Sequence, residues 1–238
     1  MLLVHISDLH FGSRFNSKVF DKAGEEINSL KPEVIVVTGD ITDEGLLPEF
    51  EVAKQRIDEF KCENLVICGG NHDYRNTGYL LLNKFFPLKQ VYETKEATIV
   101  ILKTARPDKD EGEVGYRQTL WLQRQLSRGG KLKIVAMHHH LVPVPDTGLE
   151  RHTVIDAGDV LAALRKTSVS TVLCGHKHRP WKWDFEDFSI IHAGSLSDAR
   201  LRGFFHNSYN VINIEKGKIE AKVKVVDGNE LSFEELRK

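Results

Sequence analysis

Residues 65–73 read LVICGGNHD, an apolar run followed at once by two glycines, an amide, an imidazole and a carboxylate. A short run of branched apolar residues is typical of a strand that is buried on both faces. Glycine and asparagine suit a turn after such a strand because they tolerate positive φ, but a turn gains nothing from adding His72 and Asp73. The segment therefore predicts either a polar turn or part of a functional site, and the rest of the chain decides between them.

Short apolar runs that end in polar clusters occur at four other places in the chain. They are LLVHI at 2–6, VIVVTG at 34–39, KIVAM at 133–137 and STVLCG at 170–175. Between them, apolar residues at helical spacing predict helices over 17–30, from Pro48, over 119–126, and from Asp156 as the N-cap. Strand and helix alternate, which predicts an α/β fold.

The pattern becomes rich in strands after Gly175. It predicts antiparallel strands at 181–185, 188–194, 209–214 and 219–226, and a short helix from Ser232. The irregular stretch 141–153, with two prolines, predicts a loop and therefore a place for function. No internal repeat or linker separates these parts, so we expect a single domain over residues 1–238.

The composition is that of an ordinary globular protein. The 238 residues include 33 Lys and Arg against 34 Asp and Glu, so the net charge argues against nucleic acid or an anionic membrane as a partner. No apolar stretch approaches the roughly 20 residues of a membrane helix. Three cysteines without metal-finger spacing favour a reducing compartment. We expect a cytoplasmic protein that acts as a monomer or homodimer.

Metal-capable side chains follow each of the five buried runs. They are Asp8 and His10, then Asp40, then Asn71, then a histidine from 138–140, then His176 and His178. In open α/β sheets, ligands bind at the carboxyl ends of the strands, so five separate regions are expected to meet at one sheet edge. One such residue after a strand is most often a turn or cap residue. Five turns that each supply a donor at the same edge predict a metal site.

The chemistry of these donors narrows the choice of metal. Imidazole and carboxylate without thiolate suit Mn, Fe, Zn, Co or Ni. Seven donors are too many for one ion, and they fit two divalent or mixed-valence ions that share a bridging carboxylate at a separation of roughly 3.5–4 Å. That arrangement is used for phosphoryl hydrolysis.

The motifs DLH at 8–10, GD at 39–40, GNHD at 70–73, a histidine after a strand, and GHKH at 175–178, in this order, resemble those of the calcineurin-like metallophosphoesterases. The likeness spans residues 4 to about 195. The histidine run followed by Pro143 and the tail GSLSD...NSYNVINI resemble most the cyclic-nucleotide phosphodiesterase-like branch. The resemblance implies a four-layer α/β/β/α sandwich of two packed mixed sheets flanked by helices.

The resemblance also implies a role for each motif residue. Asp8, His10 and His178 would hold one metal, Asn71, His138 and His176 the other, and Asp40 would bridge the two. His72 would contact the phosphate and assist the leaving group, with Asp73 as its orienting partner. A hydroxide bridging the metals would attack phosphorus in line.

Several histidines and one arginine are less constrained by sequence. His139 and His140 stay open as alternatives to His138, and His139 and Arg14 are candidates for substrate contacts. His5 is expected in the core, His192 in a structural role at a strand end, and His152 and His206 on the solvated surface.

The function expected is metal-dependent hydrolysis of a small nucleotide-like or other organic phosphodiester. A phosphomonoesterase is the alternative, because the same two-metal centre serves both ester types. A DNA nuclease ranks below both, since the chain ends soon after GHKH with balanced charge. A non-catalytic scaffold ranks low because every expected motif position is filled.

Overall fold

The computed structural model describes residues 1–127, 131–148 and 152–237. Two six-stranded mixed sheets form its centre. The strands of the first are β1 Leu2–Ile6, β2 Val34–Thr38, β3 Leu65–Cys68, β10 Ser208–Glu215, β11 Lys218–Val225 and β12 Glu230–Leu231. Their order is β12-β11-β10-β1-β2-β3, with β1, β2 and β3 parallel to one another and β10 antiparallel to β1.

The second sheet comes from the middle of the chain. Its strands are β4 Val91–Glu93, β5 Ala97–Ile101, β6 Leu132–Ala136, β7 Thr171–Cys174, β8 Trp181–Asp184 and β9 Ser189–His192. Their order is β4-β5-β6-β7-β9-β8, and β5, β6, β7 and β9 run parallel. The proposed ligands follow β1, β2 and β3 in the first sheet and β6 and β7 in the second. All five strands lie in parallel regions of their sheets.

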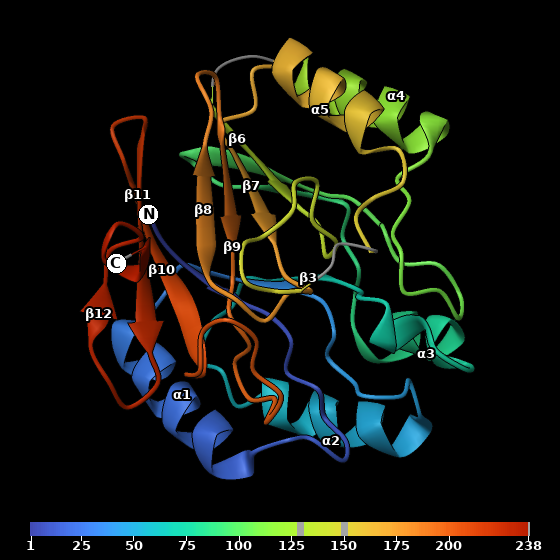
Figure 1. Cartoon of the computed structure of the whole chain (residues 1–238), viewed down its shortest axis with the longest axis vertical. Helices are drawn as coiled ribbons and strands as arrows, with labels where there is room; N and C mark the ends of the chain where they lie inside the picture. Colours follow the sequence, from blue (N-terminus) through green and yellow to red (C-terminus); the bar gives the residue numbers. More distant parts are fainter. Residues whose placement is uncertain (128–130, 149–151, 238) are drawn as a thin grey trace.

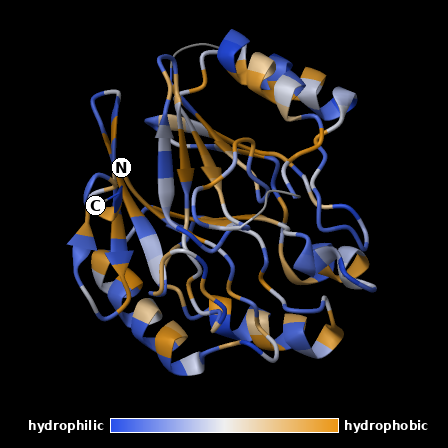
Figure 2. Ribbon diagram, viewed as in Figure 1, coloured by the Kyte–Doolittle hydropathy of each residue, from blue (hydrophilic) through white to orange (hydrophobic). Residues whose placement is uncertain are grey.

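Alternate side chains of the same strand belong to different cores. In β2, Val34 and Val36 pack in the core between the sheets, whereas Ile35 and Val37 pack in the core beneath the helices. Period-two alternation on a strand buried on both faces requires apolar residues at every position, which is why these runs are continuous. Figure 2 shows the resulting hydrophobic strands in the middle of the molecule.

Helices cover the outer face of each sheet. They are α1 Ser17–Leu30, α2 Leu47–Ile57 and α3 Gly78–Phe85 on the first sheet, and α4 Tyr116–Leu126 and α5 Ala157–Lys166 on the second. Figure 1 shows α1 and α2 at the bottom of the view and α4 and α5 at the top, with both sheets between them. The predicted four-layer α/β/β/α sandwich is confirmed.

The predicted antiparallel strands are confirmed: β8 pairs antiparallel with β9 and β10 with β11, and β9 also pairs in parallel with β7. Other local predictions were wrong. The terminal segment forms only a 3₁₀ turn at Glu235–Arg237. Asp156 stands at the N-cap of α5, but its carboxylate accepts from the backbone N–H groups of Val114 and Gly115 instead of capping the helix.

The sequence reading also missed β4, β5, β12 and α3. Residues 149–151 of the predicted loop at 141–153 lie outside the described residues. None of the helices in the described ranges is long and apolar enough to cross a membrane.

Candidate metal centre

The carboxyl ends of β1, β2 and β3 meet those of β6 and β7. We expected one sheet edge, but the site lies where the edges of two sheets come together, because the sheets pack face to face. Contacts across the junction hold it closed: the Nδ1–H of His138, after β6, donates to the backbone oxygen of Thr38 at 2.6 Å. The backbone N–H of His176, after β7, donates to the carboxylate of Asp8 at 3.0 Å.

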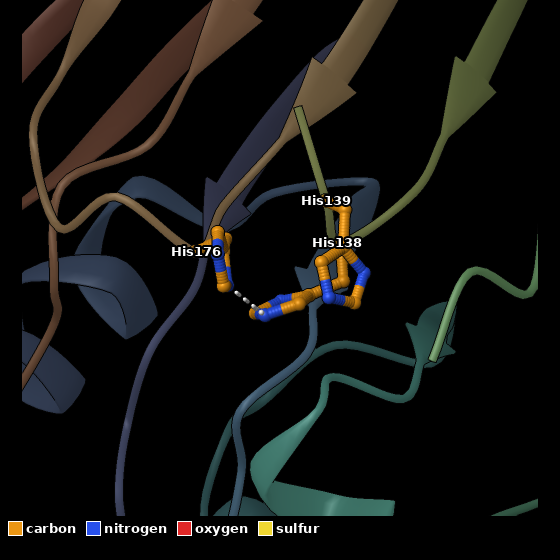
Figure 3. Close-up of side chains that lie close together, drawn as sticks. All are labelled: His138, His139 and His176. Carbon is orange, nitrogen blue, oxygen red and sulfur yellow. Dashed lines mark hydrogen bonds between the residues drawn. The ribbon is translucent and has the colours of Figure 1, made fainter. Parts of the chain in front are cut away.

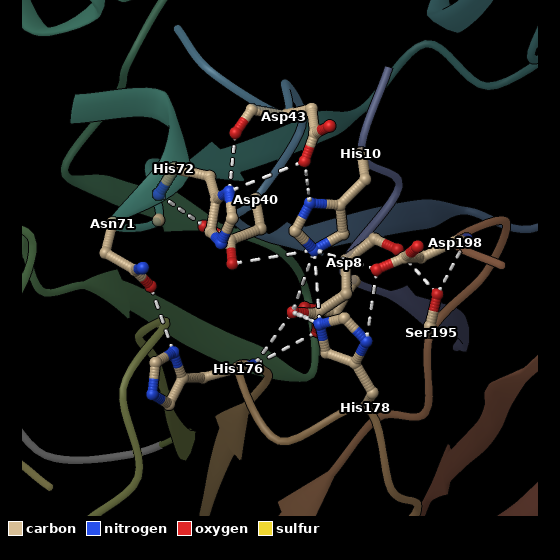
Figure 4. Close-up of polar contacts among 12 residues, drawn as sticks. Asp8, His10, Asp40, Asp43, Asn71, His72, His176, His178, Ser195 and Asp198 are labelled. Atoms are coloured by element: carbon tan, nitrogen blue, oxygen red, sulfur yellow. Dashed lines mark hydrogen bonds and ion pairs between the residues drawn. The ribbon is translucent and has the colours of Figure 1, made fainter. Parts of the chain in front are cut away.

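The first group of donors contains Asp8, His10, Asp40 and His178. All four are buried, and one ligand atom from each lies within 4.8 Å of the others. Nε2 of His178 lies 3.1 Å from Nε2 of His10 and 3.3 Å from Oδ1 of Asp8. Nε2 of His10 lies 3.7 Å from Oδ2 of Asp40. Figure 4 shows these side chains converging from separate loops.

The second group contains Asn71, His138 and His176. Oδ1 of Asn71 lies 3.0 Å from Nε2 of His138 and 3.0 Å from Nδ1 of His176. Nε2 of His138 lies 3.3 Å from Oδ2 of Asp40. The same Asp40 oxygen is therefore near both groups, which is the position that a shared ligand needs.

His138 and His139, in the run at 138–140, have different roles. His138 is the member whose Nε2 faces Asn71 and Asp40. Figure 3 shows His139 beside His138 and His176, close enough to join a metal group, but both of its ring nitrogens are engaged. Its Nε2–H donates to the backbone oxygen of Asp110 at 3.0 Å, and its Nδ1 accepts from the Thr104 hydroxyl at 2.8 Å. His139 does not line the cleft, so its predicted substrate contact is wrong.

Outer partners orient the donors. The Nδ1–H of His178 donates to the backbone oxygen of Arg200 at 2.7 Å, as that of His138 does to Thr38. The side-chain amide of Asn71 donates to Asp110 at 3.3 Å, which turns its oxygen toward the histidines. Such second contacts fix the tautomer and the ring angle of a metal-binding histidine.

The geometry fits metal cations. Because His138 and His178 each donate through Nδ1, their Nε2 lone pairs face inward, 3.2 and 3.1 Å from another imidazole nitrogen. Inward-facing Nε2 lone pairs beside buried carboxylates suit a cation between them. Although burial acts against it, neighbouring Asp40 raises the pKa of His138 to about 9, so without metal a proton takes that place.

The backbone at the site is in an unusual conformation. Five of the seven predicted ligands have positive φ between 51° and 73°: Asp8, His10, Asp40, His176 and His178. Non-glycine residues in this region cost about 1–3 kcal/mol each and persist only where the surroundings impose them. The hydrogen bonds of the two sheet edges impose them here.

The glycines of the GNHD loop allow the backbone to lie close to neighbouring groups. They do not provide a turn with positive φ. Gly69 and Gly70 do not have positive φ, contrary to our expectation. A Cβ on Gly70 would overlap Asp40. On Gly39, which has φ +87°, a Cβ would lie 2.6 Å from the Gly70 nitrogen and 2.7 Å from Nδ1 of His138.

His72 is oriented by Asp43, not by Asp73. Its Nδ1–H donates to the backbone oxygen of Asp43 at 2.5 Å, and the same nitrogen lies 3.7 Å from Oδ1 of Asp43. Asp73 instead accepts from the backbone of Ile41, Thr42 and Gly70 and from the Thr42 hydroxyl, at 2.8–3.2 Å. Burial and the charge of Asp40 raise the pKa of Asp73 to about 6. Asp73 therefore fixes the loops that carry Asp40 and His72, and its predicted role as the partner of His72 is wrong.

A cleft of about 520 Å³ opens over the donors. Arg14, a candidate for substrate contact, lines it, bound to Asp43 and 3.4 Å from Asp198. His152 is half-buried and also lines the cleft, and its ring lies 6.3 Å from that of His176. His5 and His192 are buried as expected, and His206 is exposed.

Sequence reasoning missed several residues around the donors: Asp43, Arg75, Asp110, Asp198, Arg200 and Arg202. The sequence carried a signal for two of them, because Asp43 follows the GD motif by three residues and Asp198 is the last residue of the quoted motif GSLSD. The hydroxyls of Ser195 and Ser197, in the same motif, donate to the backbone oxygens of Asp8 at 2.7 Å and Leu9 at 2.8 Å. These contacts hold the loop that carries Asp8 and His10.

Residues 1–180 match the sequence profile described as calcineurin-like phosphoesterase. The chain belongs to this family. The predicted class, a metal-dependent phosphoester hydrolase, is confirmed at the level of the family.

Two curated relatives and one solved structure illustrate the likeness. A probable glycerophosphodiester phosphodiesterase of Arcobacter nitrofigilis is 30% identical over 83% of this chain and 79% of its own. A probable cyclic nucleotide phosphodiesterase of Xenorhabdus bovienii is 24% identical over 91% and 92%. The crystal structure of a dimetal phosphatase from Danio rerio has the same fold, with a TM-score of 0.72 at 12% identity over 97% and 98%. The relatives support the predicted cyclic-nucleotide phosphodiesterase-like branch.

Proposed function

We propose that the chain hydrolyses a small organic phosphodiester with two transition-metal ions held at the junction of the sheets. Asp8, His10 and His178 would hold one ion, Asn71, His138 and His176 the other, and Asp40 both. The observation that carries the proposal is the position of Asp40, whose Oδ2 lies 3.7 Å from His10 and 3.3 Å from His138. Mn, Fe, Zn, Co and Ni all suit these donors.

When bound, the ions would activate water and withdraw charge from the phosphoryl oxygens. The residues set how much charge is left for the substrate. Asp8 and Asp40 offset part of the metal charge, and neutral Asn71 offsets none. A net positive centre would therefore face the anionic ester.

His72 would deliver a proton to the departing oxygen. Asp43 holds its Nδ1, which leaves Nε2 as the ring nitrogen able to meet an ester oxygen. The side chain of His72 is 14% exposed and lines the cleft, so it can reach a ligand.

Both curated relatives carry phosphodiesterase names, which supports a diester rather than a monoester. The volume of the cleft suits a small molecule. The cysteines of the described residues are free, which supports a reducing compartment such as the cytoplasm.

Hydrolysis of bis(p-nitrophenyl) phosphate by the metal-loaded protein tests the proposal, with p-nitrophenyl phosphate as the paired monoester. We expect turnover of the diester to exceed that of the monoester and to be lost in Asp40→Ala and His176→Ala. Asp58→Ala, on an exposed helix end, is the control for removal of a carboxylate. Absence of turnover with all five metals would contradict the proposal.

A further inference from the structure

Two of the arginines that line the cleft are paired with carboxylates, and two are not. Arg14 is paired with Asp43, and Arg75 is paired with Glu44 at 2.8 Å. Within the part of the chain that the structure describes, the guanidinium groups of Arg200 and Arg202 have no acidic or carbonyl partner, yet both line the cleft. Arg200 is exposed and Arg202 is half-buried, and two cations without an ion-pair partner beside a metal centre favour the binding of an anion.

The backbone that carries these arginines is fixed to the metal centre. The oxygen of Arg200 accepts from Nδ1 of His178 at 2.7 Å, and its N–H donates to Asp198 at 2.9 Å. The N–H of Ala199 donates to the backbone oxygen of Arg14 at 3.0 Å. The backbone at Arg200 is therefore held beside His178 at the edge of the cleft.

The two guanidinium groups also lie close enough to affect each other. Burial and then the charge of Arg200 lower the pKa of Arg202. An anion that contacts both would relieve this repulsion and could accept hydrogen bonds from two planar donors.

The described lining of the cleft contains no Phe, Tyr or Trp. Recognition of a nucleobase commonly uses an aromatic side chain for stacking. The cleft therefore offers charge, not a stacking surface, to the part of the substrate that does not react.

We propose that Arg200 and Arg202 form a subsite for a second anionic group, a phosphate or a carboxylate, on the arm of the diester that stays behind. The inference rests on the proposed function and narrows its substrate class to diesters with an anionic arm. His72 serves the departing arm, and the arginines, which lie beside His178, serve the other.

The test uses a matched set of p-nitrophenyl aryl phosphates, in which p-nitrophenolate always leaves. The retained ring carries a para carboxamide, a carboxylate or a phosphonate, so size is constant in the first pair and only charge changes. We expect kcat/KM to be about tenfold higher or more with an anionic ring. The preference should shrink as salt is raised. The carboxylate and phosphonate rings show which anion fits better.

The double variant Arg200→Gln/Arg202→Gln should bring the ratio of anionic to carboxamide substrate close to one. Arg124→Gln, an exposed arginine on α4, is the matched control and should keep the wild-type ratio. A wild-type ratio near one, or a double variant that slows all three substrates equally, would overturn the subsite.

Direct binding separates this inference from the proposed function. Calorimetry on the metal-loaded protein compares phenylphosphonate with 4-phosphonobenzoate, and neither needs turnover. Tighter binding of 4-phosphonobenzoate by the wild type but not by the double variant supports the subsite even if no diester is hydrolysed. Equal binding of the two ligands by the wild type rejects it.

Discussion

The Nδ1 atom of His72 lies 2.5 Å from the backbone oxygen of Asp43, three residues beyond the carboxylate shared by the two donor groups. The contact ties the proposed proton donor to the loop that carries the proposed bridging ligand. Because a carbonyl oxygen only accepts, Nδ1 donates in this contact, and Nε2 is the ring nitrogen left to meet a ligand. His72 is thus held near the metal donors without being one of them.

Replacement of His72 by Ala should lower kcat about 10²–10⁴-fold, because a positioned general acid contributes that much. Metal content should stay near the wild-type value, since the seven proposed ligands remain. Elemental analysis of the purified variant beside its kinetics checks both parts. Loss of metal together with activity would assign His72 to the metal centre instead.

The leaving group provides a second check on His72. A general acid matters most when the departing oxygen is basic. The loss in His72→Ala should therefore be larger for a methyl or nucleoside leaving group than for p-nitrophenolate. Equal losses across a series of leaving groups would mean that His72 acts on binding and not on departure.

Replacement of Asn71 by Asp should slow turnover while holding metal more tightly. The extra negative charge offsets positive charge that the neutral amide leaves for the ester. The carboxylate also cannot donate to Asp110 as the amide does at 3.3 Å. Titration with a chelator measures the affinity for metal, and steady-state kinetics measures kcat. A variant with unchanged kcat would contradict the charge argument.

Replacement of Gly39 by Ala should destabilise the fold by more than about 2 kcal/mol, because it combines positive φ with overlap at Gly70 and His138. Gly217→Ala is the matched control: its φ is +79°, close to the +87° of Gly39, but nothing lies within 4 Å of its Cβ position. Urea unfolding of both variants isolates the cost of the overlap. Equal costs would show that φ alone matters.

His5 should make the fold less stable in acid. Its Nδ1 accepts from Asn210 at 3.1 Å and its Nε2–H donates to Thr38 at 2.9 Å, so the ring is buried in its neutral form. Burial lowers its pKa from 6.5 to about 3. Since the folded pKa lies below the unfolded one, its stabilisation is complete above about pH 6.5 and is lost as pH falls toward 3.

The slope from this one group should be about 1.4 kcal/mol per pH unit in that window. Urea unfolding of wild type and His5→Gln from pH 8 to 5 measures it, because the amide does not titrate. The two curves should converge as the pH falls. Curves that stay parallel would show that His5 is not the group responsible.

The sequence was sufficient for the parts of the fold that depend on periodicity. Continuous apolar runs identified β1, β2, β3, β6 and β7, and the polar residues after them identified the seven proposed ligands. These signals are local, because burial on both faces and a polar turn each leave a mark in consecutive residues.

Relationships between distant segments left no such mark. Asp73 follows His72 directly, yet its carboxylate turns to the β2 loop, and Asp43 orients the imidazole. His139 follows His138 directly, yet it is held by Thr104 and Asp110. Adjacent side chains on an irregular loop point in different directions, so sequence spacing could not assign these partners.

Metal content of ligand variants tests the central claim, that Asp40 is shared between two ions. Elemental analysis of reconstituted protein should find about two ions per chain in the wild type. His178→Ala and His176→Ala should each retain about one, and Asp40→Ala should lose both. One ion in the wild type, or a full pair retained by Asp40→Ala, would contradict the claim.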